Sequence, residues 1–238
     1  MAAHDIYAGK DPRDLPVYSV ADAAFYLRMP ASTLREWVQG MSYQTKAGPK
    51  RTRPLIVRPR LRSGRPRFLS FFNLVEAHVL AEVRREHGVS LKKVRTAIEY
   101  VKLGLEVERP LLQEEFQTDG VSLFVERFGG LVNASEQGQM TIRAALEQRL
   151  QRIEHDVEGL AERIFPWFNS PTEPKRIEID SRRAFGQPTL VGTGIRVDVV
   201  ADRFMAGDSV GELAKDFGIN EDDVQVAVRW GMNARPAA

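Results

Sequence analysis

The chain of 238 residues is 43% hydrophobic and 28% charged, the balance of an ordinary globular protein long enough for one large domain or two small ones. It has no cysteine, so disulfides, thiolate metal sites and cysteine nucleophiles are excluded, and a reducing, cytoplasmic setting is expected. The four histidines are scattered along the sequence, so neither a metal site nor another cofactor is expected. No apolar run approaches the roughly 18 residues of a membrane span, and the first residues do not predict a signal peptide.

The net charge of +2 conceals an uneven distribution of charged residues. Residues 1–70 contain 13 Lys or Arg and 5 Asp or Glu, whereas the rest of the chain contains 21 and 27. This asymmetry indicates that the N-terminal part meets a polyanion and that the remainder has another role.

After an irregular N-terminal arm, residues 18–40 (YSVADAAFYLRMPASTLREWVQG) predict two short helices joined by a tight turn. Ser19 is a good N-cap for the first helix, with Asp22 three residues further on. A Met-Pro pair interrupts the helical pattern, and Gly40 ends the second helix.

These two helices have the features of a DNA-reading helix-turn-helix. Ala23 and Ala24 allow the second helix to pack closely on the first, and the second helix begins with polar residues that can face base edges and phosphates, namely Ser32, Thr33 and Arg35. The guanidinium of Arg35 can donate two hydrogen bonds to a guanine or pair with a phosphate. The plainer alternative is a helical hairpin whose charged residues face solvent.

Residues 41–67 hold nine Lys or Arg and no acid, together with four prolines that forbid a helix. Residues 55–57 predict a short strand, and the whole stretch has the pattern of a β-ribbon or a loose loop. A ribbon would form a wing across the phosphate backbone and make binding strongly salt-dependent, whereas the alternative is a disordered, solvated loop. The residues expected to contact DNA in this stretch are Arg51, Arg53, Arg58, Arg60 and Arg62.

Two amphipathic helices are predicted over residues 70–87 and 90–103, with Gly88 stopping the first and Ser90 capping the second. In order and spacing, residues 18–103 resemble the MerR-type winged helix-turn-helix, in which a phrase like TLREW marks the recognition helix. The resemblance implies DNA binding. The wing is longer and richer in Arg and Pro than is usual, and the dimerising coiled coil and cysteine effector site of metal-sensing members are missing, which disfavours a metal-responsive regulator.

The middle of the chain predicts short strands followed by one long helix. Residues 110–133 alternate in short β-type runs, and Asp119-Gly120 predicts a hairpin turn. Residues 140–164 carry apolar side chains at every third or fourth position, which predicts a long helix used for core packing or for contact with a partner or second copy. No catalytic constellation is found, so the chain is not expected to be an enzyme; four carboxylates fit solvent-facing strand positions, namely Glu114, Glu115, Asp119 and Glu126.

A linker over residues 168–176 separates off a small C-terminal domain, with a predicted hairpin and three short helices at about residues 198–206, 209–216 and 221–231. This tail resembles the family called domain of unknown function 433. The matching positions are Gly186, Pro188, Gly192, Thr193, Ile195, Val197, Gly207, Ser209, Leu213, Ala214 and Phe217. Gly194 departs from the family, in which an Arg is common at that position.

The family resemblance carries a functional implication. Proteins of this family are typically antitoxins encoded beside PIN-like ribonuclease toxins, and the whole layout resembles the larger VapB-type antitoxins of mycobacteria and other bacteria. An arginine that plugs an acidic nuclease site is the implied toxin contact, and the candidates are Arg196, Arg229 and Arg235.

Two features of the tail argue against a second nucleic-acid site there. The acids at the start of its last helix suit the helix dipole but repel phosphate, so the domain is expected to make dimer or toxin contacts. The segment Gly192-Thr193-Gly194 predicts a tight hairpin turn, because it lacks the further Gly or Lys of a phosphate-binding loop.

The combined prediction is a mainly α protein with small β. It has a MerR-like winged helix-turn-helix domain over residues 1–109, a β-hairpin plus long helix forming a middle or dimerisation region over residues 110–170, and a C-terminal three-helix, helix-turn-helix-like antitoxin-type domain over residues 171–238.

The leading functional hypothesis is a type II antitoxin that blocks a PIN-like ribonuclease and represses its own operon by binding operator DNA. It would act as a homodimer or as a hetero-oligomer with the toxin, because one short recognition helix reads too few base pairs. The alternatives are a stand-alone MerR-like transcription regulator that responds to a small molecule through the middle region, and an adaptor protein without sequence-specific DNA binding.

Overall fold

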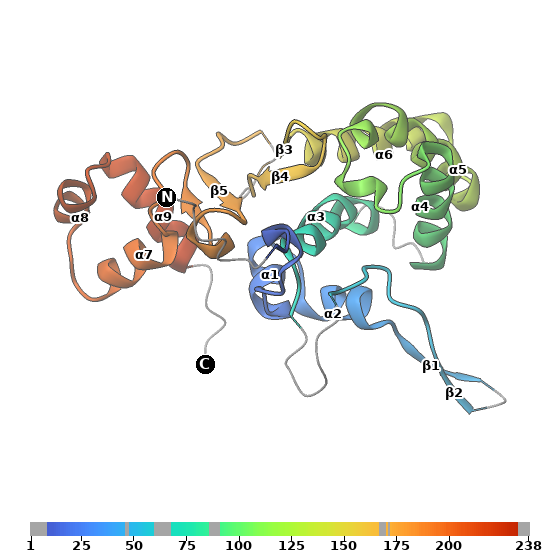
Figure 1. Cartoon of the computed structure of the whole chain (residues 1–238), viewed down its shortest axis with the longest axis horizontal. Helices are drawn as coiled ribbons and strands as arrows, with labels where there is room; N and C mark the ends of the chain where they lie inside the picture. The colour runs from blue at the N-terminus through green and yellow to red at the C-terminus, as the bar shows by residue number, and fades with distance from the viewer. Residues whose placement is uncertain are drawn as a thin grey trace. The chain divides into compact units, whose positions relative to one another are not determined.

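The computed structural model describes residues 9–45, 48–59, 68–85, 91–166, 170 and 172–232. Its contacts divide the chain into two compact units, Met1–Glu162 and Arg163–Ala238. Both are built mainly from helices with small sheets (Figure 1), as predicted. The expected boundary between residues 109 and 110 lies inside the first unit, and the three-part division of the chain stays a prediction.

The first unit begins with the predicted pair of helices, α1 (Val20–Tyr26) and α2 (Ala31–Gln39). The hydroxyl of Ser19 accepts a hydrogen bond from the backbone N–H of Asp22 at 3.0 Å and so caps α1. Gly40 ends α2 with a φ of +76°, a backbone conformation that favours glycine. Local capping chemistry therefore sets these helix ends as the sequence predicts.

The basic stretch begins as a two-stranded antiparallel ribbon of β1 (Ser42–Thr45) and β2 (Gly48–Arg51). The strand predicted over residues 55–57 is not formed, and that prediction was wrong. The backbone N–H groups of Leu55 and Ile56 instead donate to the carbonyl of Trp37, at 2.7 and 3.1 Å. Both donors therefore bond to one carbonyl in the last turn of α2, where helix carbonyls lack partners within the helix, and not to a neighbouring strand.

The core of the first unit surrounds α3 (Phe71–Arg85), which packs against the later helix α6 (Glu136–Leu150). The next helix, α4 (Leu91–Leu105), packs mainly on α5 (Val121–Val132) of the same unit. Nine of the ten residues from Phe71 to Leu80 are buried, the pattern of a central helix rather than an amphipathic surface helix. The predicted stop and cap for these helices, Gly88 and Ser90, lie outside the described residues.

Residues 110–133 are helical, and the prediction of strands and a hairpin there was wrong. They form the short turns η2 (Pro110–Leu112) and η3 (Phe116–Gly120) and the helix α5 (Val121–Val132). Apolar residues three or four positions apart fall on one buried helical face, which outweighs their partial alternation. Gly120 has an ordinary helical φ of −62° and is not a hairpin glycine. A Cβ there would lie 2.6 Å from the Phe116 ring, so glycine serves close packing.

The long helix predicted over residues 140–164 was also partly wrong. The helix α6 (Glu136–Leu150) ends at Leu150, and a hairpin of β3 (Ile153–His155) and β4 (Ala161–Ile164) follows. The turn is built by Asp156, whose carboxylate accepts from the backbone N–H groups of Glu158 and Leu160 at 3.0 Å each. Gly159 supplies the left-handed φ of +74°. Aspartate and glycine at these positions favour a turn over a continuing helix.

In the second unit, the end of β4 pairs antiparallel with β5 (Ile177–Asp180), which pairs with β6 (Thr189–Leu190). The tight turn predicted at Gly192-Thr193-Gly194 is confirmed, with left-handed φ values of +75° and +71° at the two glycines. Three helices then follow as predicted, namely α7 (Val197–Met205), α8 (Val210–Phe217) and α9 (Glu221–Met232). Among the described residues, no helix is both long enough and apolar enough to cross a bilayer.

Candidate nucleic-acid interface

The second helix of the helix-turn-helix has one buried face and one outward face. Leu34, Trp37 and Val38 are buried against the rest of the first unit. Ser32 and Arg35 are exposed, and Thr33 is half-buried. The three polar residues predicted to read DNA therefore lie in the first turns of α2, with the two exposed ones on the face opposite the core.

The turn that joins α1 and α2 carries a cation that the sequence did not single out. Arg28 has a left-handed φ of +53°, and its guanidinium carbon lies 4.5 Å from the centroid of the Phe25 ring. A non-glycine residue in this conformation costs free energy of roughly 1–2 kcal/mol. The cation–π contact offsets part of that cost and positions a positive charge at the start of the recognition helix.

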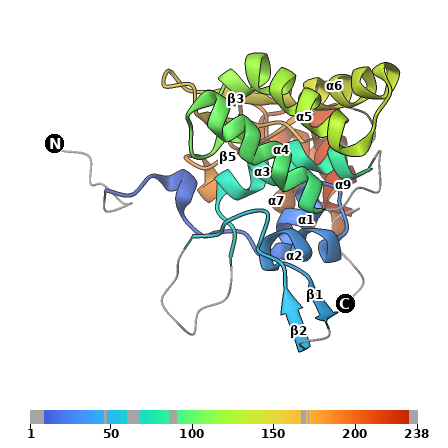
Figure 2. The same cartoon turned by 90° about the vertical axis from the view of Figure 1, so that its right-hand side faces the viewer.

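The ribbon is fixed to the end of α2 by several close contacts. The backbone N–H of Thr52 donates to the carbonyl of Met41 at 2.8 Å, and its hydroxyl accepts from the N–H of Met41 at 2.8 Å. A Cβ on Gly40 would lie 2.0 Å from the carbonyl oxygen of Thr52. Only glycine can therefore end the helix here, and the ribbon leaves α2 in a fixed direction, away from the helical pair (Figures 1 and 2).

The ribbon presents cations and one aromatic ring to solvent. Lys50 and Arg51 on β2 are exposed, as is Arg53 just beyond it. Tyr43, which is 48% exposed, lies opposite Lys50 in the antiparallel register. Exposed guanidinium and ammonium groups on a projecting ribbon are suited to phosphate contacts.

The beginning of α4 adds positive charge that sequence reasoning missed. The guanidinium of Arg95 donates to the backbone carbonyl of Arg53, which places the first turns of α4 next to the segment after the ribbon. Lys92 on the same helix is exposed and Lys93 is half-exposed. The run LKKVR at residues 91–95 was a possible signal, but only the fold brings it beside Arg53.

Arg58 lies apart from the exposed cations. It is half-buried and lines a cavity of about 450 Å³ together with Leu55, Ile56 and Val57. The remaining walls come from α3, α4 and the segment around η2. Two further residues predicted to bind DNA, Arg60 and Arg62, lie outside the described residues.

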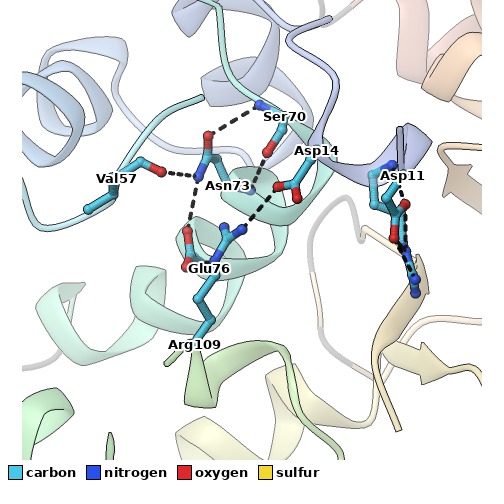
Figure 3. Close-up of polar contacts among 8 residues, drawn as sticks. Asp11, Asp14, Val57, Ser70, Asn73, Glu76 and Arg109 are labelled. Atoms are coloured by element: carbon cyan, nitrogen blue, oxygen red, sulfur yellow. Dashed lines mark hydrogen bonds and ion pairs between the residues drawn. The ribbon is translucent and has the colours of Figure 1, made fainter. Parts of the chain in front are cut away.

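A polar network connects the segment after the ribbon to α3 (Figure 3). The side-chain amide of Asn73 donates to the carbonyl of Val57 at 2.9 Å and to a carboxylate oxygen of Glu76 at 3.1 Å. Its carbonyl oxygen accepts from the backbone N–H of Ser70 at 3.2 Å. Because Asn73 and Ser70 are fully buried, losing these bonds would leave unpaired polar groups in the core.

The same network continues to Arg109, just before η2. Its Nε donates to Glu76 at 2.9 Å, and one terminal nitrogen donates to Asp14 at 3.2 Å. Burial alone lowers the pKa of Arg109, but the hydrogen bond to Glu76 and the charges of Glu76 and Asp14 more than offset this, so the pKa is raised. Arg109 thus stays charged and links the N-terminal arm, α3 and the segment before η2.

The predicted toxin-contact residues lie in the second unit. Arg196 is exposed at the start of α7 and forms an ion pair with Asp198. Arg229 is exposed on α9 and lines a cavity of about 300 Å³ whose walls include Trp230 and Pro174. Arg235 lies outside the described residues. Across the described parts of both units, no group of three or more His, Asp or Glu side chains is placed to hold a metal ion.

Comparison with known proteins finds family models that match the helix-turn-helix region and the second unit. Residues 16–98 match the family model described as "Putative DNA-binding HTH domain", and residues 177–230 match "Protein of unknown function (DUF433)". The chain is 28% identical to "Putative antitoxin VapB45" of Mycobacterium tuberculosis over 90% of its own length and 93% of that protein. It is 25% identical to "Uncharacterized protein Rv2308" of the same organism, over 94% of this chain and 93% of that protein.

One solved structure is similar over most of the chain. The X-ray crystal structure of Rv2018 from Mycobacterium tuberculosis superimposes with a TM-score of 0.70 at 26% identity, covering 90% of this chain and 98% of that one. The chain thus joins a DNA-binding type of helix-turn-helix to a DUF433 segment and resembles a VapB-type antitoxin over nine-tenths of its length.

Proposed function

We propose that this chain is the antitoxin of a type II toxin–antitoxin system. It binds and blocks a PIN-like ribonuclease toxin and represses its own operon by binding operator DNA. The observation that carries the proposal is a helix-turn-helix with an outward polar face and a basic ribbon, in a chain similar along 90% of its length to a protein named as an antitoxin. It is a cytoplasmic binding protein and not an enzyme.

On operator DNA, α2 enters the major groove with Ser32, Thr33 and Arg35 toward the base edges. The ribbon and the residues after it lie along the phosphates, where Arg51, Arg53, Arg60 and Arg62 act, joined by Lys92 at the start of α4. Because a helix of nine residues reads only a few base pairs, a second copy reads the other half of the operator.

The second unit binds the toxin. Acids at the start of α9, of which Glu221 and Asp222 are exposed, disfavour contact with a polyanion there. The predicted contacts are Arg196, Arg229 and Arg235, which would meet carboxylates of a nuclease site.

A growth assay tests the proposal. The product of the gene beside this one is expressed alone and then together with this chain. Arrested growth that co-expression rescues through a stable complex supports the proposal, whereas a harmless neighbour that forms no complex contradicts it. A mobility-shift assay on the operon's upstream DNA then tests repression. Arg35→Gln should reduce discrimination between operator and random DNA by about 1–3 kcal/mol, while Lys215→Gln, an exposed change on α8, should leave it unchanged.

A second function, a transcription regulator that responds to a small molecule, is favoured by one observation. The 450 Å³ cavity at the base of the ribbon has apolar walls that include Leu80, Ile98 and Leu111, with charged groups such as Glu99 at its edge. A molecule bound there would press on the segment that carries Arg53 and Arg58. Operator binding that changes on adding one compound from a metabolite library, without any toxin partner, would favour this function over the first.

A further inference from the structure

An aromatic side chain in the second unit is held out into solvent by an unfavourable backbone. Phe185 is 75% exposed, in the turn η4 (Ala184–Gly186). Three consecutive residues have left-handed φ values, +46° at Ala184, +53° at Phe185 and +75° at Gly186. Only the glycine adopts this conformation without cost. A turn shaped for stability alone would place Gly or Asn here, and strain of this kind gathers at functional sites.

Backbone hydrogen bonds hold this turn in one shape. The carboxylate of Asp180 accepts from the N–H of Arg182 at 2.8 Å, and the N–H of Gly186 donates to the carbonyl of Arg183 at 2.8 Å. The N–H of Gln187 donates to the carbonyl of Ala184 at 3.0 Å. The ring of Phe185 is therefore presented on a fixed support, so little conformational entropy is lost when a partner covers it.

Two buried carboxylates on β5 hold the guanidinium of Arg183, which lies two residues before Phe185 in the chain. The side chains of Glu178 and Asp180 are 1% and 5% exposed. The guanidinium of Arg183 reaches both, with nitrogens 3.7 Å from a carboxylate oxygen of each. The same Glu178 oxygen accepts from the backbone N–H of Gly192 at 3.3 Å, which ties the neighbouring turn to this one. Arg183 nevertheless remains 49% exposed, so its outer part is available to a partner.

Charge is distributed unevenly along the second unit. Residues 163–196 carry six Lys or Arg and three Asp or Glu, and two of those acids are the buried Glu178 and Asp180. Residues 197–232, which form α7 to α9, carry three Lys or Arg and eight Asp or Glu. The segment that holds Phe185 is therefore the basic part of this unit, and the helices are its acidic part.

We propose that the turn from Ser181 to Gly186, here called the Phe185 turn, is the surface that docks the toxin. Phe185 fills an apolar pocket on that protein, and Arg182 and Arg183 meet carboxylates at its rim. Aromatic and arginine side chains, which this turn combines, are enriched among the interface residues that carry most of a binding free energy. A folded protein with acidic groups is favoured over RNA, because the eight acids of residues 197–232 repel a polyanion from so small a unit.

This inference rests on the proposed function, and it names a contact surface that differs from Arg196, Arg229 and Arg235. Its substitution test uses the full chain and the purified product of the neighbouring gene. Phe185→Asn removes the ring, and because Asn tolerates the left-handed conformation, the fold should be as stable as in the wild type or more so. The dissociation constant for the neighbouring gene's product should rise by about thirtyfold or more. The matched control Met205→Ala, an exposed apolar residue on α7, should change it less than about threefold.

A charge variant provides a second arm. Arg182→Gln should slow association with the neighbouring gene's product several-fold at low salt, and the difference should shrink as salt is added. Unchanged binding by both Phe185→Asn and Arg182→Gln, with thermal unfolding like the wild type, would overturn the inference while leaving the antitoxin proposal intact.

Two other results would also overturn it. The Phe185→Asn change could abolish self-association of this chain but not toxin binding, in which case the turn is a contact between copies. It could instead abolish retention of a single-stranded RNA oligonucleotide, in which case the ring stacks on bases. A wild-type chain that does not bind the neighbouring gene's product at all contradicts the proposed function itself.

Discussion

Raising the salt concentration should weaken operator binding by an amount that the exposed cations of the first unit set. Among the described residues of the ribbon, the segment after it and the start of α4, four cations are exposed and suited to phosphates, namely Lys50, Arg51, Arg53 and Lys92. Four neutralised phosphates give a slope of about −3.6 for the logarithm of the association constant against the logarithm of salt concentration, and a dimer gives about −7. Between 50 and 200 mM salt, these four contacts alone should lower affinity about a hundredfold per bound protomer, and contacts by Arg60 and Arg62 would add to the fall.

Single substitutions divide this effect between phosphate and base contacts. Arg51→Gln should reduce the magnitude of the slope by about 0.9 per protomer on operator and random DNA alike. Arg35→Gln should leave the slope nearly unchanged but remove about 1–3 kcal/mol of discrimination. Fluorescence anisotropy over a salt series measures both. If Arg51→Gln leaves the slope as it was, or Lys215→Gln on α8 lowers it equally, the ribbon is not the phosphate contact and the reasoning fails.

Two further predictions concern stability. Gly40→Ala should lower the free energy of unfolding by at least about 2 kcal/mol in urea titrations, because it adds both left-handed strain and a clash with Thr52. The control Gly130→Ala, in α5 with no atom near its Cβ, should raise the free energy of unfolding by about 0.5–1 kcal/mol. Equal effects of the two substitutions would disprove the role of Gly40. Burial, followed by the charge of Arg149, lowers the pKa of His78 from 6.5 to about 3, so His78 is neutral in the native state. The stabilisation linked to neutral His78 is fully present above pH 6.5. It is lost as the pH falls toward 3, which lowers the free energy of unfolding by up to about 5 kcal/mol. His78→Gln, which can still donate to the carbonyl of Arg149, should flatten the decline of stability with pH; an unaltered acid profile would assign the decline to other groups.

The parts of the fold that the sequence predicts well are those that local chemistry determines. Ser19 and Gly40 mark helix ends by their own capping preferences, and the turn at residues 192–194 needs only its glycines. The three helices of the tail likewise agree with their spacing. Each of these signals is complete within a few neighbouring residues.

In the segments predicted incorrectly, two local signals compete, and the structure follows the one that the prediction did not. In residues 110–133 the buried positions 121, 124, 125 and 128 follow helical spacing, while a partial alternation and the pair Asp119-Gly120 imitate a hairpin. Gly120 packs against the ring of Phe116, four residues earlier, and does not form a hairpin turn. In residues 153–164 an apolar period continues through a turn that Asp156 and Gly159 impose.

The candidate interface follows the same division. The outward face of α2 could be predicted because helical spacing alone separates Arg35 from Trp37. The role of α4 could not, since residues 53 and 95 meet only in the folded chain. The exposure of Phe185 depends on a backbone conformation that apolar residues rarely adopt, so sequence reasoning assigns such a residue to the core.

The close packing of Gly40 against Thr52 affects which operator sequences can be bound. The ribbon is bonded to the end of α2, and the following segment is bonded to Trp37. The distance between α2 in the major groove and the ribbon on the phosphate backbone is therefore fixed. A duplex whose groove width does not match this distance must bend or twist to contact both α2 and the ribbon. Base pairs that no side chain touches would then affect affinity through their stiffness, and flexible pyrimidine–purine steps between the two contacts would be favoured.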